Sequence, residues 1–168
     1  MASWNELVAD LDGQPDDQKR TEWLLNKQRE TITEISKIRS GRNVLFYASA
    51  FLQKPDVPPF SIQLTFEEIN GFMSALHRMR CNLGLTLILH TPGGITNAAE
   101  TIAAYLHSKF DDIEVIVPTY ALSAGTMLSL AADRIVMGRQ SQLGPIDPQI
   151  PVVGNRMVSA CAILEQFE

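Results

Sequence analysis

The stretch Leu85-Thr-Leu-Ile-Leu-His-Thr-Pro-Gly-Gly-Ile95 contains the features that decide the fold. Its first six residues form a short apolar run that predicts a buried strand, and Thr91-Pro-Gly-Gly94 predicts a tight turn. Apolar residues then recur at helical spacing from Ile95 to Phe110, which indicates a helix directly after the turn. A buried strand that leads through a turn into a helix is typical of a parallel α/β protein.

The same alternation continues on both sides of this stretch. Further buried strands are predicted at residues 43–49, 113–118 and 134–138. A helix that Thr65 can cap is predicted from the spacing of five apolar residues, Phe66, Ile69, Met73, Leu76 and Met79. A second turn, Leu122-Ser-Ala-Gly-Thr126, opens a short helix that ends near residue 132. Strands that alternate with helices imply a mainly parallel sheet with right-handed crossovers.

The two ends of the chain differ from this middle part. Residues 1–41 are rich in charge and predict a helix from about Asp16 to Ser40 with a one-sided apolar stripe, so they form an N-terminal helical extension to a core at 42–168. Near the other end, Leu143 to Pro148 predicts a rigid loop and Val158 to Glu168 predicts a helix. That helix has no capping glycine, and we expect the chain to be a C-terminally truncated piece of a longer protein.

The composition excludes several classes of protein. With 45% apolar and 20% charged residues the chain is neither disordered nor fibrous, and 14 Lys and Arg against 19 Asp and Glu argue against a nucleic-acid partner. No apolar run is long enough to cross a bilayer and the start lacks a secretory signal, so we expect a cytoplasmic protein without a membrane span. Cys81 and Cys161 are expected to be free thiols, without a metal site.

Two glycine-containing turns carry the candidate chemistry. Both follow predicted strands and lead into helices, and ligands of parallel α/β proteins gather at the carboxyl ends of strands. Gly93 and Gly94 can expose N–H groups that hold an oxyanion, Ser123 can act as a nucleophile, and the Ala124 N–H can be a second oxyanion donor. Each turn also has a simpler interpretation, because Pro-Gly-Gly is commonly only a turn and a serine before a helix is commonly only an N-cap. Together they predict acyl transfer.

Four motifs carry a family resemblance: Thr91-Pro-Gly-Gly94, Leu122-Ser-Ala-Gly-Thr-Met127, Ala132-Asp-Arg-Ile135 and Ser141-Gln-Leu-Gly-Pro-Ile-Asp-Pro-Gln149. From Asn43 onward the chain resembles the serine dehydrogenase proteinase family, which is related to signal peptide peptidase A and the Clp proteolytic subunit. The resemblance implies an α/β fold of the Clp/crotonase type, a superhelix of β-β-α units. It also implies that Ser123 is the nucleophile and that Gly93 and Ala124 are the oxyanion donors. The residues that would border an extended peptide are Ile95, Leu143, Gly144 and Pro145.

The general base is missing from this pattern. Where the Clp proteolytic subunit carries its histidine, the chain reads Gln142-Leu-Gly-Pro145. We expect His77 and His107 on solvated helix surfaces and His90 packed at a strand end. Relatives with a Ser-Lys dyad suggest a lysine some forty residues after the serine, but the last lysine here is Lys109. The resemblance therefore implies a dyad whose lysine is absent from this chain.

The expected function is hydrolysis of peptide bonds by a serine endopeptidase, through an acyl-enzyme on Ser123 and without a metal or organic cofactor. This chain alone is expected to be weakly active or inactive, because losing a base costs at least as much as losing one oxyanion donor. Two alternatives stay open: an inactive scaffold with the Clp fold, and a crotonase-like acyl-CoA enzyme. The expected partners are a peptide or protein substrate and further copies of the chain in a homo-oligomer.

Overall fold

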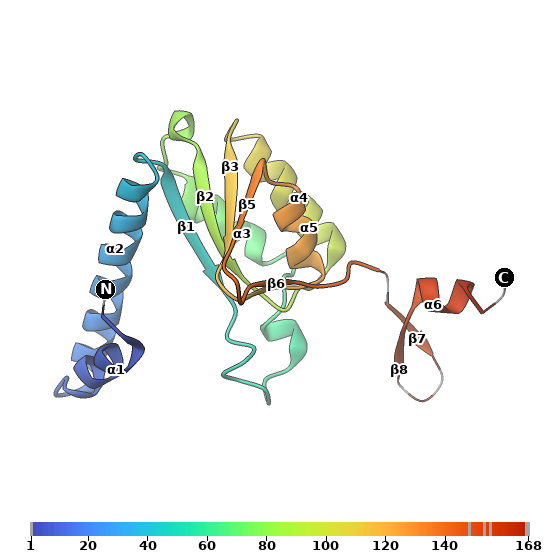
Figure 1. Ribbon diagram of the computed structural model, residues 1–168, viewed down its shortest axis with the longest axis horizontal. Helices are drawn as coiled ribbons and strands as arrows, with labels where there is room; N and C mark the ends of the chain where they lie inside the picture. Colours follow the sequence, from blue (N-terminus) through green and yellow to red (C-terminus); the bar gives the residue numbers. More distant parts are fainter. Residues whose placement is uncertain (1, 148, 153, 155, 167–168) are drawn as a thin grey trace. The chain divides into compact units, whose positions relative to one another are not determined.

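The computed structural model describes residues 2–147, 149–152, 154 and 156–166 (Figure 1). The chain divides into two compact units, Met1–Val44 and Leu45–Glu168. The first unit is helical, and the second contains nearly all of the strands.

The N-terminal unit holds two helices, α1 (Trp4–Asp12) and α2 (Asp17–Ile38). The expected helix over residues 16–40 is confirmed as α2, and the Asp16 carboxylate accepts the Lys19 N–H at 2.8 Å at its start. Helix α1 was not predicted, although its sequence carries a capping box. There the Ser3 hydroxyl accepts the Glu6 N–H at 3.3 Å, and the Glu6 carboxylate accepts the Ser3 N–H at 2.6 Å.

The main sheet of the second unit has four strands in the order β1-β2-β3-β5. Their bounds are β1 (Asn43–Ala48), β2 (Leu85–His90), β3 (Ile113–Val117) and β5 (Arg134–Met137). The β2–β3 and β3–β5 pairs are parallel, with Leu85 opposite Ile113 and Glu114 opposite Arg134. The predicted parallel α/β class is therefore confirmed, because each crossover between parallel strands contains a helix.

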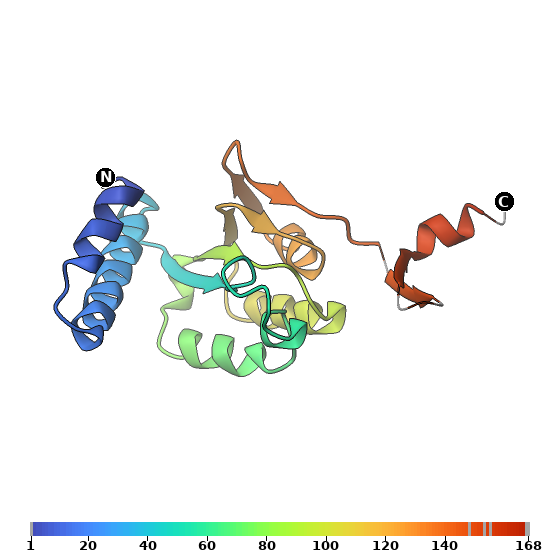
Figure 2. The same cartoon turned by 90° about the horizontal axis from the view of Figure 1, so that it is seen from below.

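Three helices cover one face of this sheet: α3 (Glu68–Leu76), α4 (Thr96–His107) and α5 (Ala124–Leu130), as Figure 2 shows. Strand residues of the covered face are excluded from solvent, with Leu85, Leu87 and Leu89 each 0% exposed. The apolar face predicted for α4 is largely confirmed, since its buried residues are Ala98, Ala99, Ile102 and Leu106. The core thus lies between the sheet and these helices.

Helix α3 buries only part of the face predicted for it: Leu76 is buried and Ile69 and Met79 pack against the core, but Phe72 is buried as well. Phe66 and Met73 are 52% and 46% exposed, whereas Phe72 and Leu76 are each 4% exposed. The ring of Phe72 stacks on Tyr47 of β1, with ring centroids 5.5 Å apart. Phe72 and Met73 both lie at helical spacing from Leu76, so periodicity alone does not decide between them.

The end of the chain forms smaller elements. A two-stranded parallel sheet joins β4 (Tyr120–Ala121) to β6 (Gln142–Leu143), which takes up only the first residue of the loop expected from Leu143, and residues 144–147 belong to no helix or strand. An antiparallel pair joins β7 (Gln149–Val152) to β8 (Arg156–Ser159), and α6 (Ala160–Leu164) follows. The helix predicted from Val158 is wrong at its start, because Val158 and Ser159 belong to a strand. Pro148 of the predicted loop and residues 167–168 of the predicted helix lie outside the described residues.

Both cysteines, Cys81 and Cys161, are exposed free thiols, as expected. Short 3₁₀ turns lie at Pro59–Ser61 and Cys81–Leu83. Across the described part of the chain, no helix combines the length and the apolar character needed to span a membrane.

Candidate active site

The two glycine turns meet because the chain segments that lead into them pair side by side. Just after β2, Thr91 forms a parallel bridge with Ala121 of β4. The Thr91 N–H donates to the Tyr120 carbonyl oxygen at 3.0 Å, and the Leu122 N–H donates to the Thr91 carbonyl oxygen at 3.1 Å. This pairing carries the turn after β2 and the turn before α5 to the same edge of the sheet.

Gly93 lies against the backbone of the second turn. A Cβ at position 93 would come within 2.5 Å of the Leu122 carbonyl oxygen, 2.7 Å of the Ser123 Cβ and 3.2 Å of the Ala124 nitrogen. Gly93 also has a φ of +100°, a backbone conformation that residues other than glycine rarely adopt. The structure therefore brings together three of the residues singled out by sequence, Gly93, Ser123 and Ala124.

Ser123 has an unusual backbone conformation. Its φ of 51° and ψ of −119° lie in a strained region for a residue with a side chain. The residue is exposed, and its hydroxyl makes no capping hydrogen bond to α5. Among the described residues its hydroxyl has no hydrogen-bond partner at all. The simpler interpretation of Ser123 as an N-cap thus does not apply.

The two candidate oxyanion donors differ in their hydrogen bonding. Ala124 is the first residue of α5, is 0% exposed, and its N–H finds no acceptor within the described ranges of the chain. The Gly93 N–H instead donates to the Thr91 hydroxyl at 3.1 Å. One amide beside Ser123 therefore has no acceptor among the described residues, and the other is held by a neighbouring side chain.

Gly94 and Ile95 pair with a different segment, the one around Leu64. The Leu64 N–H donates to the Gly93 carbonyl oxygen at 2.7 Å, and the Ile95 N–H donates to the Leu64 carbonyl oxygen at 2.8 Å. A Cβ at position 94 would overlap the Leu64 backbone. The close approach of Leu64 therefore requires a glycine there. Ile95 is 43% exposed at the start of α4, so its side chain is accessible.

The segment Leu143 to Pro145 lies beside the other flank of the serine turn. Leu143 pairs with Ala121, and a Cβ at Gly144 would lie 3.1 Å from the Leu122 side chain. The Thr126 hydroxyl accepts a hydrogen bond from the Gly144 N–H at 2.9 Å and donates one to the Ala121 carbonyl oxygen at 2.7 Å. Sequence reasoning missed Thr126, and its only signal was a polar residue in a largely apolar short helix.

Within the described part of the chain, no hydrogen bond links any of the three histidines to Ser123. His77 is exposed at the end of α3. His90 stacks on Phe51 with ring centroids 5.0 Å apart, its Nδ1 lies 2.8 Å from the Thr119 hydroxyl, and burial lowers its pKa below the usual range. The prediction that His90 packs at a strand end is confirmed.

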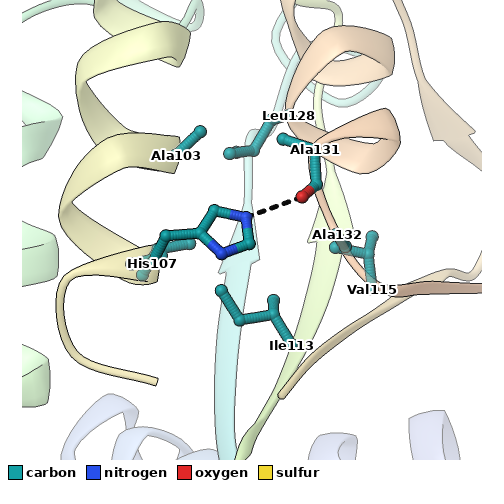
Figure 3. A pocket seen from close by; sticks show the side chains of 8 residues that line it. Ala103, His107, Ile113, Val115, Leu128, Ala131 and Ala132 are labelled. Carbon is teal, nitrogen blue, oxygen red and sulfur yellow. Dashed lines mark hydrogen bonds between the residues drawn. The ribbon is translucent and has the colours of Figure 1, made fainter. Parts of the chain in front are cut away.

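His107 has a structural partner. It is exposed, as expected, but its Nε2 lies 2.7 Å from the carbonyl oxygen of Ala131, and the carbonyl requires that nitrogen to be the donor (Figure 3). The ring borders a small apolar pocket between α4, β3 and α5. Because Ala131 ends α5 and Ser123 begins it, His107 anchors the far end of the helix that carries the serine.

In the described part of the chain, the lysines and acidic residues form no second candidate site. Lys54 and Lys109 are exposed, and the Lys109 ammonium lies 5.7 Å from the centre of the Tyr105 ring. Within the ranges that the structure describes, no group of three or more His, Cys, Asp or Glu side chains could hold a metal ion.

A parallel α/β core with an exposed, strained serine beside a glycine turn defines a class of serine hydrolases. A family model described as ClpP-like SDH-type serine proteinase matches residues 15–168, and the chain belongs to this family. Membership confirms the family expected from the four motifs and the Clp-like α/β class of the core.

Among the proteins similar to this chain are two curated relatives and a solved structure. The uncharacterized protein MJ1495 of Methanocaldococcus jannaschii is 34% identical over 146 residues, 86% of this chain and 48% of that protein. The uncharacterized protein MJ0137 of the same organism is 41% identical over 87 residues, 52% of this chain and 30% of that protein. The chain thus spans about half the length of these relatives or less.

The solved structure is a mutant of the 1510-N membrane-bound stomatin-specific protease in complex with a substrate peptide. It is 22% identical to this chain with a TM-score of 0.49, and the alignment covers 62% of this chain and 51% of that one.

Replacing Gly93 by alanine tests the close approach of the two turns. Gly41→Ala is the matched control, because Gly41 also has a positive φ, +80°, but a Cβ there meets nothing within 4 Å. We expect Gly41→Ala to lower the free energy of unfolding by about 1–2 kcal/mol, from backbone strain alone. Gly93→Ala adds a clash with Leu122 and Ser123 and should cost clearly more in urea denaturation. Equal losses would contradict this packing.

His90 predicts an acid-sensitive contribution to stability. Because burial lowers its pKa in the folded state, the unfolded chain takes up the proton first as the pH falls below about 6.5. The free energy of unfolding should therefore decrease below this pH, down to the folded-state pKa of His90. The variant His90→Gln should weaken that decrease in denaturation series between about pH 5 and 7.5. A slope equal to that of the parent protein would rule out the half-buried imidazole of His90 as the cause.

Proposed function

We propose that the chain carries the nucleophile and oxyanion hole of a serine endopeptidase that hydrolyses peptide bonds through an acyl-enzyme on Ser123. The observation that carries the proposal is the conformation of Ser123, which is strained, exposed and free of any capping bond. Strain of this kind, about 1–3 kcal/mol, persists where the surrounding structure enforces it, and it clusters at active sites.

The geometry supports a specific first step. The Ser123 oxygen attacks the scissile carbonyl carbon, and the carbonyl π pair moves onto the carbonyl oxygen. The Ala124 N–H, which has no acceptor among the described residues, stabilises the resulting oxyanion, and the Gly93 N–H shares its hydrogen between the oxyanion and the Thr91 hydroxyl. The C–N bond then breaks, the amine leaves with a proton, and water releases the acyl group from Ser123 by the same route.

A base must accept the proton of Ser123, and we propose that it is a lysine outside this chain. In the described residues no hydrogen bond links a histidine or lysine side chain to Ser123, and the last lysine of the sequence is Lys109. The chain also covers only 48% of the length of MJ1495. A desolvated lysine with a lowered pKa would complete a Ser-Lys dyad.

The segments on both sides of the serine turn fit an extended peptide. Ile95 follows the glycine turn on one side, and Leu143, Gly144 and Pro145 lie beside Leu122 on the other. An extended substrate can add its main-chain hydrogen bonds to such short edge segments, while the pockets between them receive its side chains. We therefore propose a peptide or protein substrate.

We further propose a cytoplasmic homo-oligomer in which residues 1–41 extend from a peptidase core at 42–168. The exposed apolar residues of α2, Leu24, Leu25 and Ile38, support a contact with another copy. Light scattering of the purified chain should report a mass well above 18.6 kDa. A concentration-independent monomer would contradict the oligomer and leave the peptidase proposal intact.

Two substitutions of Ser123 test its proposed role. We expect Ser123→Ala and Ser123→Gly each to abolish labelling by a fluorophosphonate probe in the natural full-length protein, because the nucleophilic oxygen is gone. Ser123→Gly should also raise the free energy of unfolding by about 1 kcal/mol, because glycine relieves the strain at φ 51°.

Ser40→Gly is the matched control, since Ser40 is exposed with a φ of 59°. It should stabilise the protein in the same way and leave labelling unchanged. Labelling that persists in Ser123→Ala would show that another residue is the nucleophile. A parent protein that is folded but never labelled would favour the inactive scaffold.

A further inference from the structure

Thr91 occupies the point where the two turns meet. It is 0% exposed, and both of its backbone polar groups bond to the segment that leads into Ser123, through Tyr120 and Leu122. These backbone bonds do not depend on the side chain. Substitutions of the Thr91 side chain therefore probe what its hydroxyl and its methyl group do, while the strand pairing stays in place.

The hydroxyl of Thr91 bonds to the glycine turn. It accepts the Gly93 N–H at 3.1 Å and lies 3.5 Å from the Gly93 carbonyl oxygen. Gly93 is itself buried, and its Cα faces Ser123 and Ala124. A glycine in a turn is conformationally free, so a buried acceptor that holds its N–H fixes the orientation of that peptide group.

The methyl group of Thr91 packs on the other turn. Gly125, the second residue of α5, has the Thr91 Cγ2 so close that a Cβ at position 125 would overlap it. The next neighbours of such a Cβ are the Ala121 Cβ at 3.6 Å and the Thr91 Cβ at 3.8 Å, which are ordinary contacts. Of the atoms around Gly125, the Thr91 methyl group is therefore the one that leaves no room for a Cβ at this position.

We infer that Thr91 is a positioning residue that sets the spacing between the oxyanion turn and the nucleophile turn. Its hydroxyl orients Gly93, its methyl group spaces Gly125, and Ser123 lies between these contacts. The inference rests on the proposed function. It explains the residue type, because serine lacks the methyl group and valine lacks the hydroxyl.

Two substitutions at Thr91 separate the two groups. Thr91→Val keeps the shape and removes the hydroxyl, so the Gly93 N–H loses its acceptor. We expect about tenfold slower fluorophosphonate labelling of Ser123 in the folded full-length protein, and faster hydrogen exchange at the Gly93 amide. Thr91→Ser keeps the hydroxyl and should retain the amide protection, but it should slow labelling by about threefold because the methyl group that spaces Gly125 is gone. Thr101→Val, on the exposed side of α4, is the matched control and should change neither.

A double substitution tests the methyl contact. Gly125→Ala should slow labelling about tenfold, because the new Cβ meets the Thr91 methyl group. Combining it with Thr91→Ser removes that methyl group and should restore the rate to that of Thr91→Ser alone. Gly71→Ala is the control, since a Cβ at this helical glycine of α3 meets nothing within 4 Å. Circular dichroism gives the folded fraction of each variant, to which the labelling rates are normalised.

The outcomes distinguish this inference from the proposed function. A parent protein in which Ser123 is never labelled overturns the proposed function and this inference with it. Labelling of the parent together with an unchanged rate in Thr91→Val overturns the inference alone. So does a double variant that stays as slow as Gly125→Ala. If Gly125→Ala fails to fold, a double variant that does not recover folding and labelling overturns it as well.

Discussion

The backbone of Gly93 lies so close to the backbone from Leu122 to Ala124 that no side chain fits between them. This approach is possible only because Thr91 and Ala121 pair in parallel just before the two turns. It places the Gly93 N–H, the Ala124 N–H and the Ser123 hydroxyl at one edge of the sheet. Every step of the proposed chemistry depends on this contact, since an oxyanion hole made of main-chain amides tolerates little displacement.

The short helix α5 is held at both ends. At its start, Ser123 adopts a strained conformation and the Thr126 hydroxyl ties the helix to Gly144. At its end, His107 donates to the Ala131 carbonyl oxygen. A helix of seven residues has little stability of its own, so these tertiary contacts are what keep its first turn in place. The fold thus supports the strain at Ser123 from several directions.

The sequence predicted the strands at Leu85–His90 and Ile113–Val117 well, because continuous apolar runs between turns have few alternatives. The family and the meeting of Gly93 with Ser123 also followed from motifs. The burial of Phe72 rather than Met73 in α3 could not be predicted, because both residues fit a helical stripe. The hairpin β7–β8 was not predicted, and its last two residues, Val158 and Ser159, were assigned to the helix that follows it. The hydroxyl contacts of Thr91 and Thr126 leave no pattern in the sequence, since only tertiary packing creates them.

The most direct test is a crystal structure of the full-length protein with a peptide aldehyde or boronate bound. The account predicts a covalent bond from the Ser123 oxygen to the inhibitor, with an inhibitor oxygen within about 3 Å of both the Ala124 and the Gly93 nitrogens. An adduct on another residue, or one whose oxygen points away from these two amides, would contradict it.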